Sequence, residues 1–403
     1  MKKELEVYIH IPFCARKCAY CDFLSAPASS DTMHQYLEAL LQEIREFPWE
    51  EEYEVSTVFF GGGTPSILPA EWIGRILETL EERQGNGGSD YAGRVWKPVP
   101  AASESVSARE ITIECNPGTA DFEKLRAYHE MGINRLSLGL QSADDQELKC
   151  LGRIHTWEEF LDTYQAARRA GFENINIDLM SALPGQTEAS WESTLKKVLA
   201  LKPEHISAYS LIVEEGTPFY ERYEEDVKRR EAGEACIALP SEEEERRMYA
   251  LTEQYLASAG MYRYEISNYA KPGYECRHNI GYWRRTDYVG FGLGASSLLK
   301  NVRYRNPEDL SSYLKKDFSG REKEKLTIPD QMSEFMFLGL RMTEGVSEQK
   351  YSETFGVRME EIYAEPLRKL IDENLICRKN GQVYLTDRGR DLANPVMAEF
   401  LLD

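Results

Sequence analysis

The feature that most constrains the fold of this chain is a regular alternation of short β-prone runs and amphipathic helical patterns over its first half. Such an alternation predicts repeated βαβ units and therefore a sheet of parallel strands. Six strands of this kind fit an open or partial barrel as well as a doubly wound sheet. We expect strands at 7–11, 56–60, 110–115, 135–140, 174–180 and 205–211, and helices near 32–46, 70–83, 121–131, 156–170 and 188–201.

The last part of the chain has a different pattern. Helical patterns at 330–341, 347–354 and 360–373 precede two β-prone runs that are joined by Asn380-Gly381. Asn-Gly between such runs is typical of a tight hairpin, and helices followed by a hairpin predict a small winged-helix-like α+β module. Acidic residues outnumber basic ones from Asp330 onward, which favours packing or partner docking over DNA binding.

Composition narrows the class of protein. The 403 residues carry a net charge of −20, which disfavours binding to nucleic acid. No apolar run is long enough for a membrane span, and the first residues lack the apolar core of a signal peptide. We therefore expect a cytoplasmic protein whose cysteines are thiols or metal ligands.

Residues 84–109, rich in Gly, Ser, Pro and Ala, are expected to form an exposed insertion before the third strand.

Three cysteines, Cys14, Cys18 and Cys21, crowd into a loop after the first predicted strand with the spacing C-x3-C-x2-C. Three thiols in one loop are too many for core filling. One alternative is a zinc site with His10 or a distant residue as the fourth ligand. The other is a 4Fe-4S cluster in which three irons bind cysteine and the fourth iron is open to a ligand. The remaining cysteines are isolated in the sequence.

Polar residues and glycines follow or interrupt several predicted strands. Gly62, Gly63 and Thr64 follow the second strand, where glycines are either a turn or a place of close ligand approach. Glu114 alternates with apolar residues in the third strand, and Asp178 lies in the fifth. A carboxylate inside a parallel sheet needs a cation or hydrogen-bond donors, so each is either a structural ion pair or a ligand-binding group.

The cysteine spacing resembles the signature of the radical S-adenosylmethionine (SAM) superfamily. Further motifs resemble its oxygen-independent coproporphyrinogen III oxidase-like branch: Y-x-H-x-P-F-C at Tyr8–Cys14, then GGGTP, LGLQS, LGR and, after Asp178, LPGQ. This resemblance implies a partial (β/α)6 TIM-like barrel. It also implies that Cys14, Cys18 and Cys21 hold a 4Fe-4S cluster whose open iron binds the amino and carboxylate groups of SAM.

The resemblance also implies roles for residues around the cluster. Tyr8, Gly62 and Glu114 match positions that contact the cluster-bound SAM. A second group matches positions that line a second SAM site or the substrate cavity in the oxidases: Tyr20, Gly63, Thr64, Gln141, Arg153 and Asp178.

Two activities compete within this branch. The oxidases carry a fourth cysteine where this chain has Phe23, and they have a long N-terminal arm, whereas seven residues precede Tyr8 here. The run HNIGYW at His278–Trp283 resembles the H-N-x-x-Y-W motif of the HemW family of haem chaperones. That resemblance implies haem binding near His278 and transfer of haem to acceptor haemoproteins such as respiratory enzymes, reached by a transient membrane contact.

The sequence leaves alternatives open for the role of the HNIGYW motif and for the function of the protein. His278 is either a haem ligand or a packed, hydrogen-bonded core residue, and Cys276 is a second candidate ligand. The chain itself is a haem chaperone with little or no oxidase activity, a porphyrinogen decarboxylase, or a structural zinc protein. No nucleic-acid partner is expected, and an oligomer is compatible with the sequence.

We expect three segments along the chain. Residues 1–215 would form the barrel, and residues 216–325, which carry HNIGYW, would cover its mouth. Residues 326–403 would form the winged-helix-like module.

Overall fold

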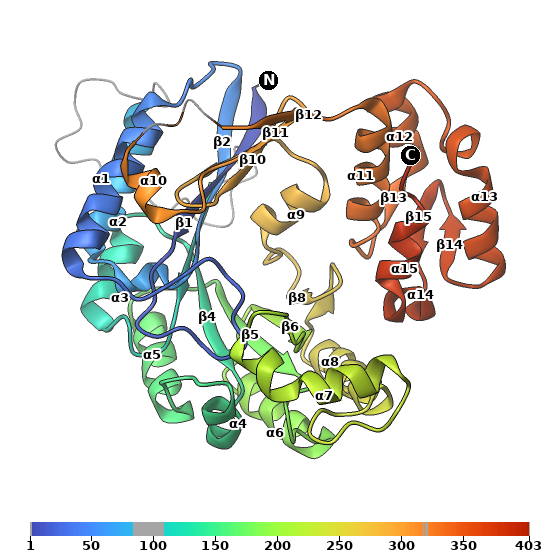
Figure 1. Ribbon diagram of the computed structural model, residues 1–403, viewed down its shortest axis with the longest axis horizontal. Helices are drawn as coiled ribbons and strands as arrows, with labels where there is room; N and C mark the ends of the chain where they lie inside the picture. Colours follow the sequence, from blue (N-terminus) through green and yellow to red (C-terminus); the bar gives the residue numbers. More distant parts are fainter. Residues whose placement is uncertain (1, 84–108, 317, 319–320, 403) are drawn as a thin grey trace.

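The computed structural model describes residues 2–83, 109–316, 318 and 321–402, so the predicted insertion at 84–109 lies outside the described residues except for Arg109. The strands described in the first 325 residues form one sheet, in the order β12-β11-β10-β9-β1-β2-β3-β4-β5-β6-β8-β7 (Figure 1). Its centre is parallel and confirms the predicted α/β fold. The central strands are β1 (Lys3–Ile11), β2 (Tyr53–Gly62), β3 (Glu110–Cys115), β4 (Arg135–Gln141), β5 (Ile175–Ser181) and β6 (His205–Ser210).

Helices connect these strands and pack along the outer face of the curved sheet (Figure 1). Their starts follow ordinary capping rules; for example, Thr156 and Glu159 form a capping box, which satisfies backbone N–H groups at the first turn. The predicted helices are confirmed, with small shifts at their ends, and α4 is an addition. The helices are α1 (Ser30–Glu46), α2 (Ala70–Arg83), α3 (Phe122–Glu130), α4 (Asp145–Cys150), α5 (Trp157–Arg169) and α6 (Glu188–Leu199).

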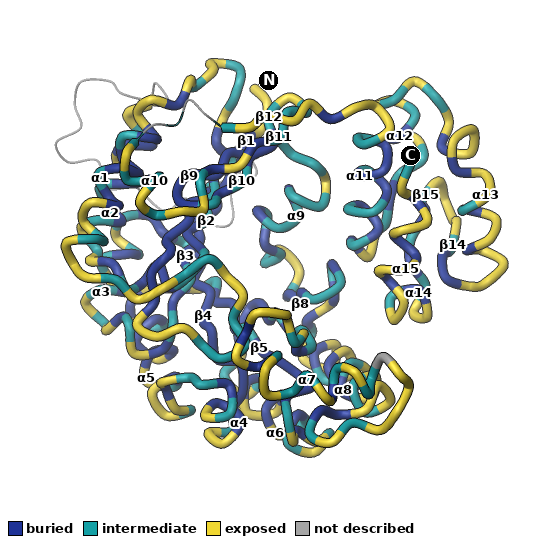
Figure 2. Tube along the Cα trace, in the orientation of Figure 1, coloured by how far each residue is buried: buried dark blue, intermediate teal, exposed yellow. Residues whose placement is uncertain are grey.

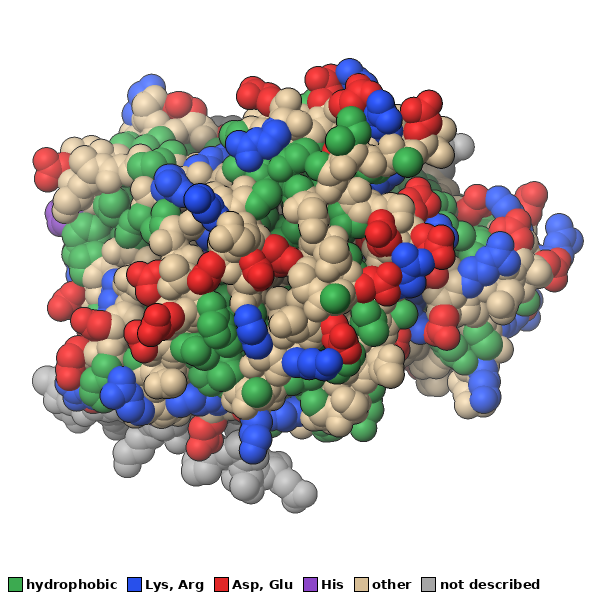
Figure 3. Space-filling view, turned by 90° about the horizontal axis from the view of Figure 1, so that it is seen from below, with side chains coloured by type: hydrophobic (Ala, Val, Ile, Leu, Met, Phe, Trp, Pro, Cys, Tyr) green, Lys and Arg blue, Asp and Glu red, His purple; other side chains and the backbone are tan. Residues whose placement is uncertain are grey.

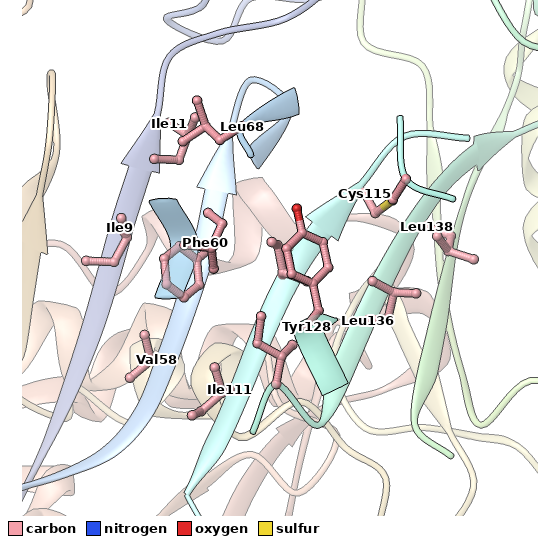
Figure 4. Close-up of a cluster of buried hydrophobic side chains, with 14 of the residues drawn as sticks. Ile9, Ile11, Val58, Phe60, Leu68, Ile111, Cys115, Tyr128, Leu136 and Leu138 are labelled. Carbon is pink, nitrogen blue, oxygen red and sulfur yellow. The ribbon is translucent and has the colours of Figure 1, made fainter. Parts of the chain in front are cut away.

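The apolar core lies between the sheet and these helices. Figure 4 shows Phe60, Ile111 and Leu136 from neighbouring strands packed near Tyr128 of α3. Cys115, at the end of β3, belongs to the same core and also lines the edge of a cavity that its neighbour Glu114 faces. The period-2 alternation predicted for the third strand therefore sorts β3 into a core face and a cavity face.

The segment after β6 adds strands to both edges of the sheet. Strand β8 pairs with β6 in antiparallel orientation, and β9 pairs with β1 in parallel orientation. Helix α9 connects the two edges. The sequence did not predict these short strands, because runs of two to four residues carry little periodicity. The elements are α7 (Pro218–Glu231), α8 (Glu242–Ser258), β7 (Tyr262–Arg263), β8 (Asn268–Ala270), α9 (Arg277–Trp283), β9 (Tyr288–Phe291), β10 (Ser296–Leu299), β11 (Val302–Arg305), α10 (Leu310–Leu314) and β12 (Lys323–Lys325).

The C-terminal part has an apolar core of its own (Figure 2). Helices precede a hairpin whose turn residues, Asn380 and Gly381, both have positive φ, as the Asn-Gly pair predicted. None of the helices in the described part of the chain is long and apolar enough to cross a membrane. The elements are α11 (Ile328–Gly339), β13 (Val346–Ser347), α12 (Glu348–Phe355), α13 (Met359–Asp372), β14 (Ile376–Lys379), β15 (Gln382–Leu385), α14 (Asp387–Asp391) and α15 (Ala393–Ala398).

A buried carboxylate joins the barrel to the added edge of the sheet. Glu43 of α1 is 2% exposed and accepts hydrogen bonds from Tyr313 Oη at 2.6 Å, Asn306 Nδ2 at 2.7 Å and the Gly292 N–H at 2.9 Å. Arg321 forms an ion pair with it. Burial raises the pKa of Glu43, and the Arg321 charge lowers it. Glu43 thus holds four residues of the β9–β12 region against α1.

We expect Glu43→Ala to reduce the free energy of unfolding by about 3–5 kcal/mol, because it leaves the buried Arg321 and its polar neighbours without their acceptor. Urea denaturation followed by circular dichroism measures this change. Glu46→Ala, on the exposed face of the same helix, is the control and should change stability by less than about 0.5 kcal/mol. Equal effects of the two substitutions would contradict the prediction.

Candidate functional site

A cavity of about 330 Å³ opens at the carboxyl ends of the parallel strands. It is covered by the loop that carries the three cysteines, and this is the edge at which parallel α/β sheets place their ligands. We call it the cysteine cavity. Most of the residues singled out from the sequence line it: Cys14, Cys18, Tyr20, Cys21, Gly62, Gly63, Thr64, Glu114, Gln141, Arg153 and Asp178.

Backbone hydrogen bonds hold the cysteine loop at its first cysteine and between its second and third cysteines. The Cys14 N–H donates to the Ala26 carbonyl at 3.3 Å, and the Ala19 N–H donates to the Leu151 carbonyl at 3.2 Å. All three thiols are free, and Arg153 Nη1 lies 3.6 Å from Cys18 Sγ. Among the residues that the structure describes, no three His, Cys, Asp or Glu side chains are grouped closely enough to hold one metal ion.

The glycine run after β2 packs directly against the lead-in to the cysteines. Gly62 has φ +110°, and a Cβ on it would lie 2.5 Å from His10 Cε1. A Cβ on Gly63 would lie 2.6 Å from the Phe13 carbonyl oxygen. Both glycines are therefore required by close packing inside the protein, whether or not a ligand also approaches them.

Two carboxyl groups face the cysteine cavity from β3 and β5. Burial raises the pKa of Glu114 to about 8, with a further increase from the charge of Asp178, while the Gly62 N–H, 3.1 Å away, lowers it. Asp178 accepts hydrogen bonds from Asn176 Nδ2 at 2.7 Å and Ser137 Oγ at 3.1 Å, and burial raises its pKa. Their direct hydrogen-bond partners are neutral, and the charge of the buried Arg135 lowers the pKa of both groups.

Arg153 reaches across the opposite wall of the cavity. Its Nη2 donates to the Gly139 carbonyl at 2.6 Å and to Asn116 Oδ1 at 2.7 Å. Asn116 and Tyr209 were missed in the sequence, although they lie at or next to the ends of β3 and β6. Tyr209 donates to Gln141 Oε1 at 3.1 Å. Asn268 and Asn279, from the segment after β6, also line the cavity; Asn279 belongs to the HNIGYW motif, whereas Asn268 carried no sequence signal.

His278 and Tyr8 are not among the residues that line the cysteine cavity. His278 is 1% exposed and is stacked on Phe59 with 5.0 Å between ring centroids. Its Nδ1 is 2.7 Å from Thr57 Oγ1, and its Nε2 is 3.0 Å from Tyr282 Oη. Burial lowers the pKa of His278 to about 3. Both ring nitrogens are thus engaged inside the protein, the arrangement of a packed core histidine.

Tyr8 instead lines a second cavity, of about 530 Å³, together with Tyr282 and Trp283 of HNIGYW. We call it the aromatic cavity. Phe23, which follows the third cysteine by two residues and is 68% exposed, lines both cavities. The two cavities are therefore neighbours on either side of the cysteine loop.

Comparison with known proteins identifies the family. The model of the radical SAM superfamily matches residues 8–198, and that of the HemN C-terminal domain matches residues 326–392. The haem chaperone HemW of Lactococcus lactis is 36% identical over 405 residues, which cover 100% of this chain and 99% of that protein. The chain belongs to the HemW family of radical SAM proteins.

HemW proteins from other bacteria match over similar lengths. The protein of Bacillus subtilis is 37% identical over 98% of both chains, and that of Escherichia coli is 31% identical over 99% of this chain and 98% of its own length. Among solved structures, coproporphyrinogen III oxidase (HemN) from Escherichia coli has a TM-score of 0.78 at 24% identity, with 99% of this chain and 90% of that chain covered. This chain therefore has the fold of that oxidase.

We expect Glu114→Gln to stabilise the ligand-free protein at alkaline pH. The pKa of Glu114 is raised from 4.5 in the unfolded chain to about 8 in the folded protein. The free energy of unfolding of the wild type therefore falls as the pH rises between those two values. The gain in stability of Glu114→Gln over the wild type should therefore be absent below pH 4.5, increase up to about pH 8 and then stay constant. Thermal midpoints across this range measure it, with Glu123→Gln on exposed α3 surface as the control. A difference that does not vary with pH would contradict the assignment.

Proposed function

We propose that this protein is a haem chaperone that carries a 4Fe-4S cluster on Cys14, Cys18 and Cys21, binds SAM beside the cluster and passes haem to acceptor haemoproteins. The observation that carries this proposal is similarity at 31–37% identity, over nearly the whole chain, to proteins named haem chaperones. Membership in the radical SAM superfamily implies the cluster and SAM. The acceptors would be haemoproteins such as respiratory enzymes, reached from the cytoplasm by a transient membrane contact.

The donor set suits the cluster. Three thiols of one loop line one cavity, and a 4Fe-4S cluster takes one thiolate for each of three irons. The Arg153 guanidinium lies beside the loop, with Nη1 3.6 Å from Cys18 Sγ. A cluster held by Cys14, Cys18 and Cys21 would supply the electron for reductive cleavage of SAM.

The charges of the cavity suit SAM. Glu114 and Asp178 accept hydrogen bonds from neutral donors, and their pKa values stay raised although the charge of Arg135 lowers both, so the cavity has room for a further cation. SAM carries a sulfonium and an ammonium group, which would supply it, and its carboxylate is the kind of group that an arginine such as Arg153 binds. We assign Tyr8, Gly62 and Glu114 to the cluster-bound SAM. The residues that we assign to the inner part of the cavity are Tyr20, Gly63, Thr64, Gln141, Arg153 and Asp178.

The alternative is an oxygen-independent coproporphyrinogen III oxidase, which has the same fold. Two features favour the chaperone. The position of a fourth cysteine is taken by Phe23, and the HNIGYW motif contributes Tyr282 and Trp283 to a separate cavity that is larger than the cysteine cavity. We propose segments 1–215, 216–325 and 326–403 for the barrel, the HNIGYW segment and the C-terminal module.

We expect Cys18→Ala to lose most of its iron after anaerobic reconstitution with iron and sulfide, because one corner of the cluster loses its ligand. Iron and sulfide analysis, together with the brown visible absorption, measures the loss. Cys377→Ala, in the C-terminal module, is the matched control and should retain the iron of the wild type. A wild-type loop that is filled with zinc and takes up no iron under these conditions would contradict the cluster assignment.

We expect the reconstituted protein to bind ferric haem, with a shift of the Soret band, and to release no carbon dioxide from coproporphyrinogen III in the presence of SAM and reductant. Absorption spectroscopy and product analysis on one preparation measure both. Decarboxylation at a rate comparable with that of an authentic oxidase would favour the alternative function. Absence of any Soret shift would remove the chaperone assignment.

A further inference from the structure

Behind the cysteine cavity, a series of hydrogen bonds runs from Asp178 into the interior of the barrel. Asn176 lies two residues before Asp178 on β5, so both side chains point to the same face of the sheet. His205 lies opposite Asn176 in the register of β5 and β6. Asn176 is 2% exposed and His205 is 0% exposed, so both lie out of contact with solvent. Asp178 lines the cavity, whereas Asn176 and His205 lie behind it.

The contacts in this series are short. Asn176 Nδ2 donates to Asp178 Oδ1 at 2.7 Å. His205 Nδ1 is 2.6 Å from Asn176 Oδ1, and His205 Nε2 is 2.8 Å from Tyr264 Oη. The Cys276 N–H donates to the same Tyr264 hydroxyl at 3.2 Å, so the series extends to the residue that caps the start of α9. We call these contacts the donor relay.

The direction of the donor relay is fixed from the α9 end. A backbone N–H can only donate, so Tyr264 Oη accepts from Cys276 and has its own proton left for His205 Nε2. A neutral imidazole carries one ring proton, which must then lie on Nδ1 and point to Asn176 Oδ1. Asn176 therefore turns its NH2 group toward Asp178, and every donor in the series points toward that carboxyl group.

The surroundings of His205 keep its ring neutral. Burial lowers the pKa of the imidazole well below its usual range, and the charge of the buried Arg135 lowers it further. A neutral ring has one donor and one acceptor, which is what a one-way series of donors requires. At the other end, burial raises the pKa of Asp178, and the hydrogen bond from Asn176 opposes that rise more than any other contact does.

We propose that Asn176, His205 and Tyr264 are positioning residues that present Asp178 to the ligand of the cysteine cavity as a hydrogen-bond acceptor. The inference rests on the proposed function, in which SAM binds in this cavity. Asp178 Oδ1 accepts from Asn176 and Oδ2 accepts from Ser137, so the side chain selects a ligand group that donates. The ammonium group and the ribose hydroxyls of SAM are groups of this kind, whereas a second carboxylate is not.

The first test compares H205N with H205Q in the cluster-reconstituted full chain. Asparagine carries its amide near the position of Nδ1 and can still donate to Asn176, whereas glutamine carries it near the position of Nε2 and contacts only Tyr264. We expect H205Q to bind SAM at least about tenfold more weakly than the wild type, because Asn176 can then turn its oxygen toward Asp178. H205N should bind SAM within about threefold of the wild type, because the last donors of the relay are kept. Isothermal titration calorimetry measures both affinities.

H34Q is the matched control, because it makes the same exchange at a histidine of α1 whose side chain is 55% exposed, and it should bind SAM as the wild type does. Iron content and thermal midpoint show that each variant is folded. A space-filling role for His205 would give H205N and H205Q the same affinity, and that result would overturn the donor relay while SAM binding stands. A wild type that binds no SAM would overturn the proposed SAM site and this inference together.

The second test observes the ring of His205 directly in the wild type and needs no ligand. Long-range proton–nitrogen NMR spectra of the reconstituted chain with isotope-labelled histidine show which nitrogen of each of the six histidines carries a proton. We expect a neutral His205 with its proton on Nδ1. Y264F, which removes only the hydroxyl, identifies the signals of His205 by shifting them. A wild-type ring with its proton on Nε2, or with both nitrogens protonated, would overturn the donor relay and leave the proposed function standing.

Discussion

The hydrogen-bonded register between β1 and β2 is the interaction on which the site depends. It places His10 opposite Gly61 and Ile11 opposite Gly62, and it continues beyond the strands as the Gly63 N–H donates to the Ile11 carbonyl at 2.8 Å. The Thr64 N–H donates to the Phe13 carbonyl at 2.7 Å. The chain therefore enters the cysteine loop in contact with the glycine run, and a side chain on either Gly62 or Gly63 would push the loop away from the strand ends. Backbone hydrogen bonds from Gly63 and Thr64 fix the start of the cysteine loop, and the three thiols can therefore face one cavity.

Charge gives the cysteine cavity its chemical character. Carboxyl groups on β3 and β5 are buried with neutral hydrogen-bond donors, and the charge of Arg135 offsets the rise of their pKa values only in part. Arg153 lies across the cavity beside Cys18. Burial of an ionisable group without an opposite charge costs free energy, and proteins keep such groups mainly where a ligand supplies the charge. The positive sulfonium and ammonium groups of SAM suit the carboxyl groups, and its carboxylate suits Arg153. The charges of the cavity therefore support the proposal of SAM binding, as the three cysteines do. The mixture of acidic and basic side chains on the face drawn in Figure 3 shows no comparable separation of charge.

Helix α9 has a different role from that of the barrel strands. Glu110 of β3 accepts from the backbone N–H groups of Arg277 and His278, which anchors the start of the helix to the sheet. The short helix then separates two cavities and contributes polar groups to one and rings to the other. Because its own hydrogen bonds fix His278 inside the protein, the motif acts through the residues that it positions, Tyr282 and Trp283.

The sequence by itself determined the parallel α/β core, the C-terminal helices with their hairpin, and the cysteine loop with the strand-end residues around it. These follow from local signals: period-2 and period-3.6 patterns, the Asn-Gly turn, and the shared edge at which parallel strands end. Only the tertiary structure decided the edge strands β8–β12, the part that Asn116, Tyr209 and Asn279 play in the cavity, and the place of His278. The edge strands are too short to carry a pattern, and a lone asparagine or histidine looks alike in a core or in a site. Which ring nitrogens are engaged depends on Thr57, more than two hundred residues away along the chain, and such distant pairings arise only when the chain is folded.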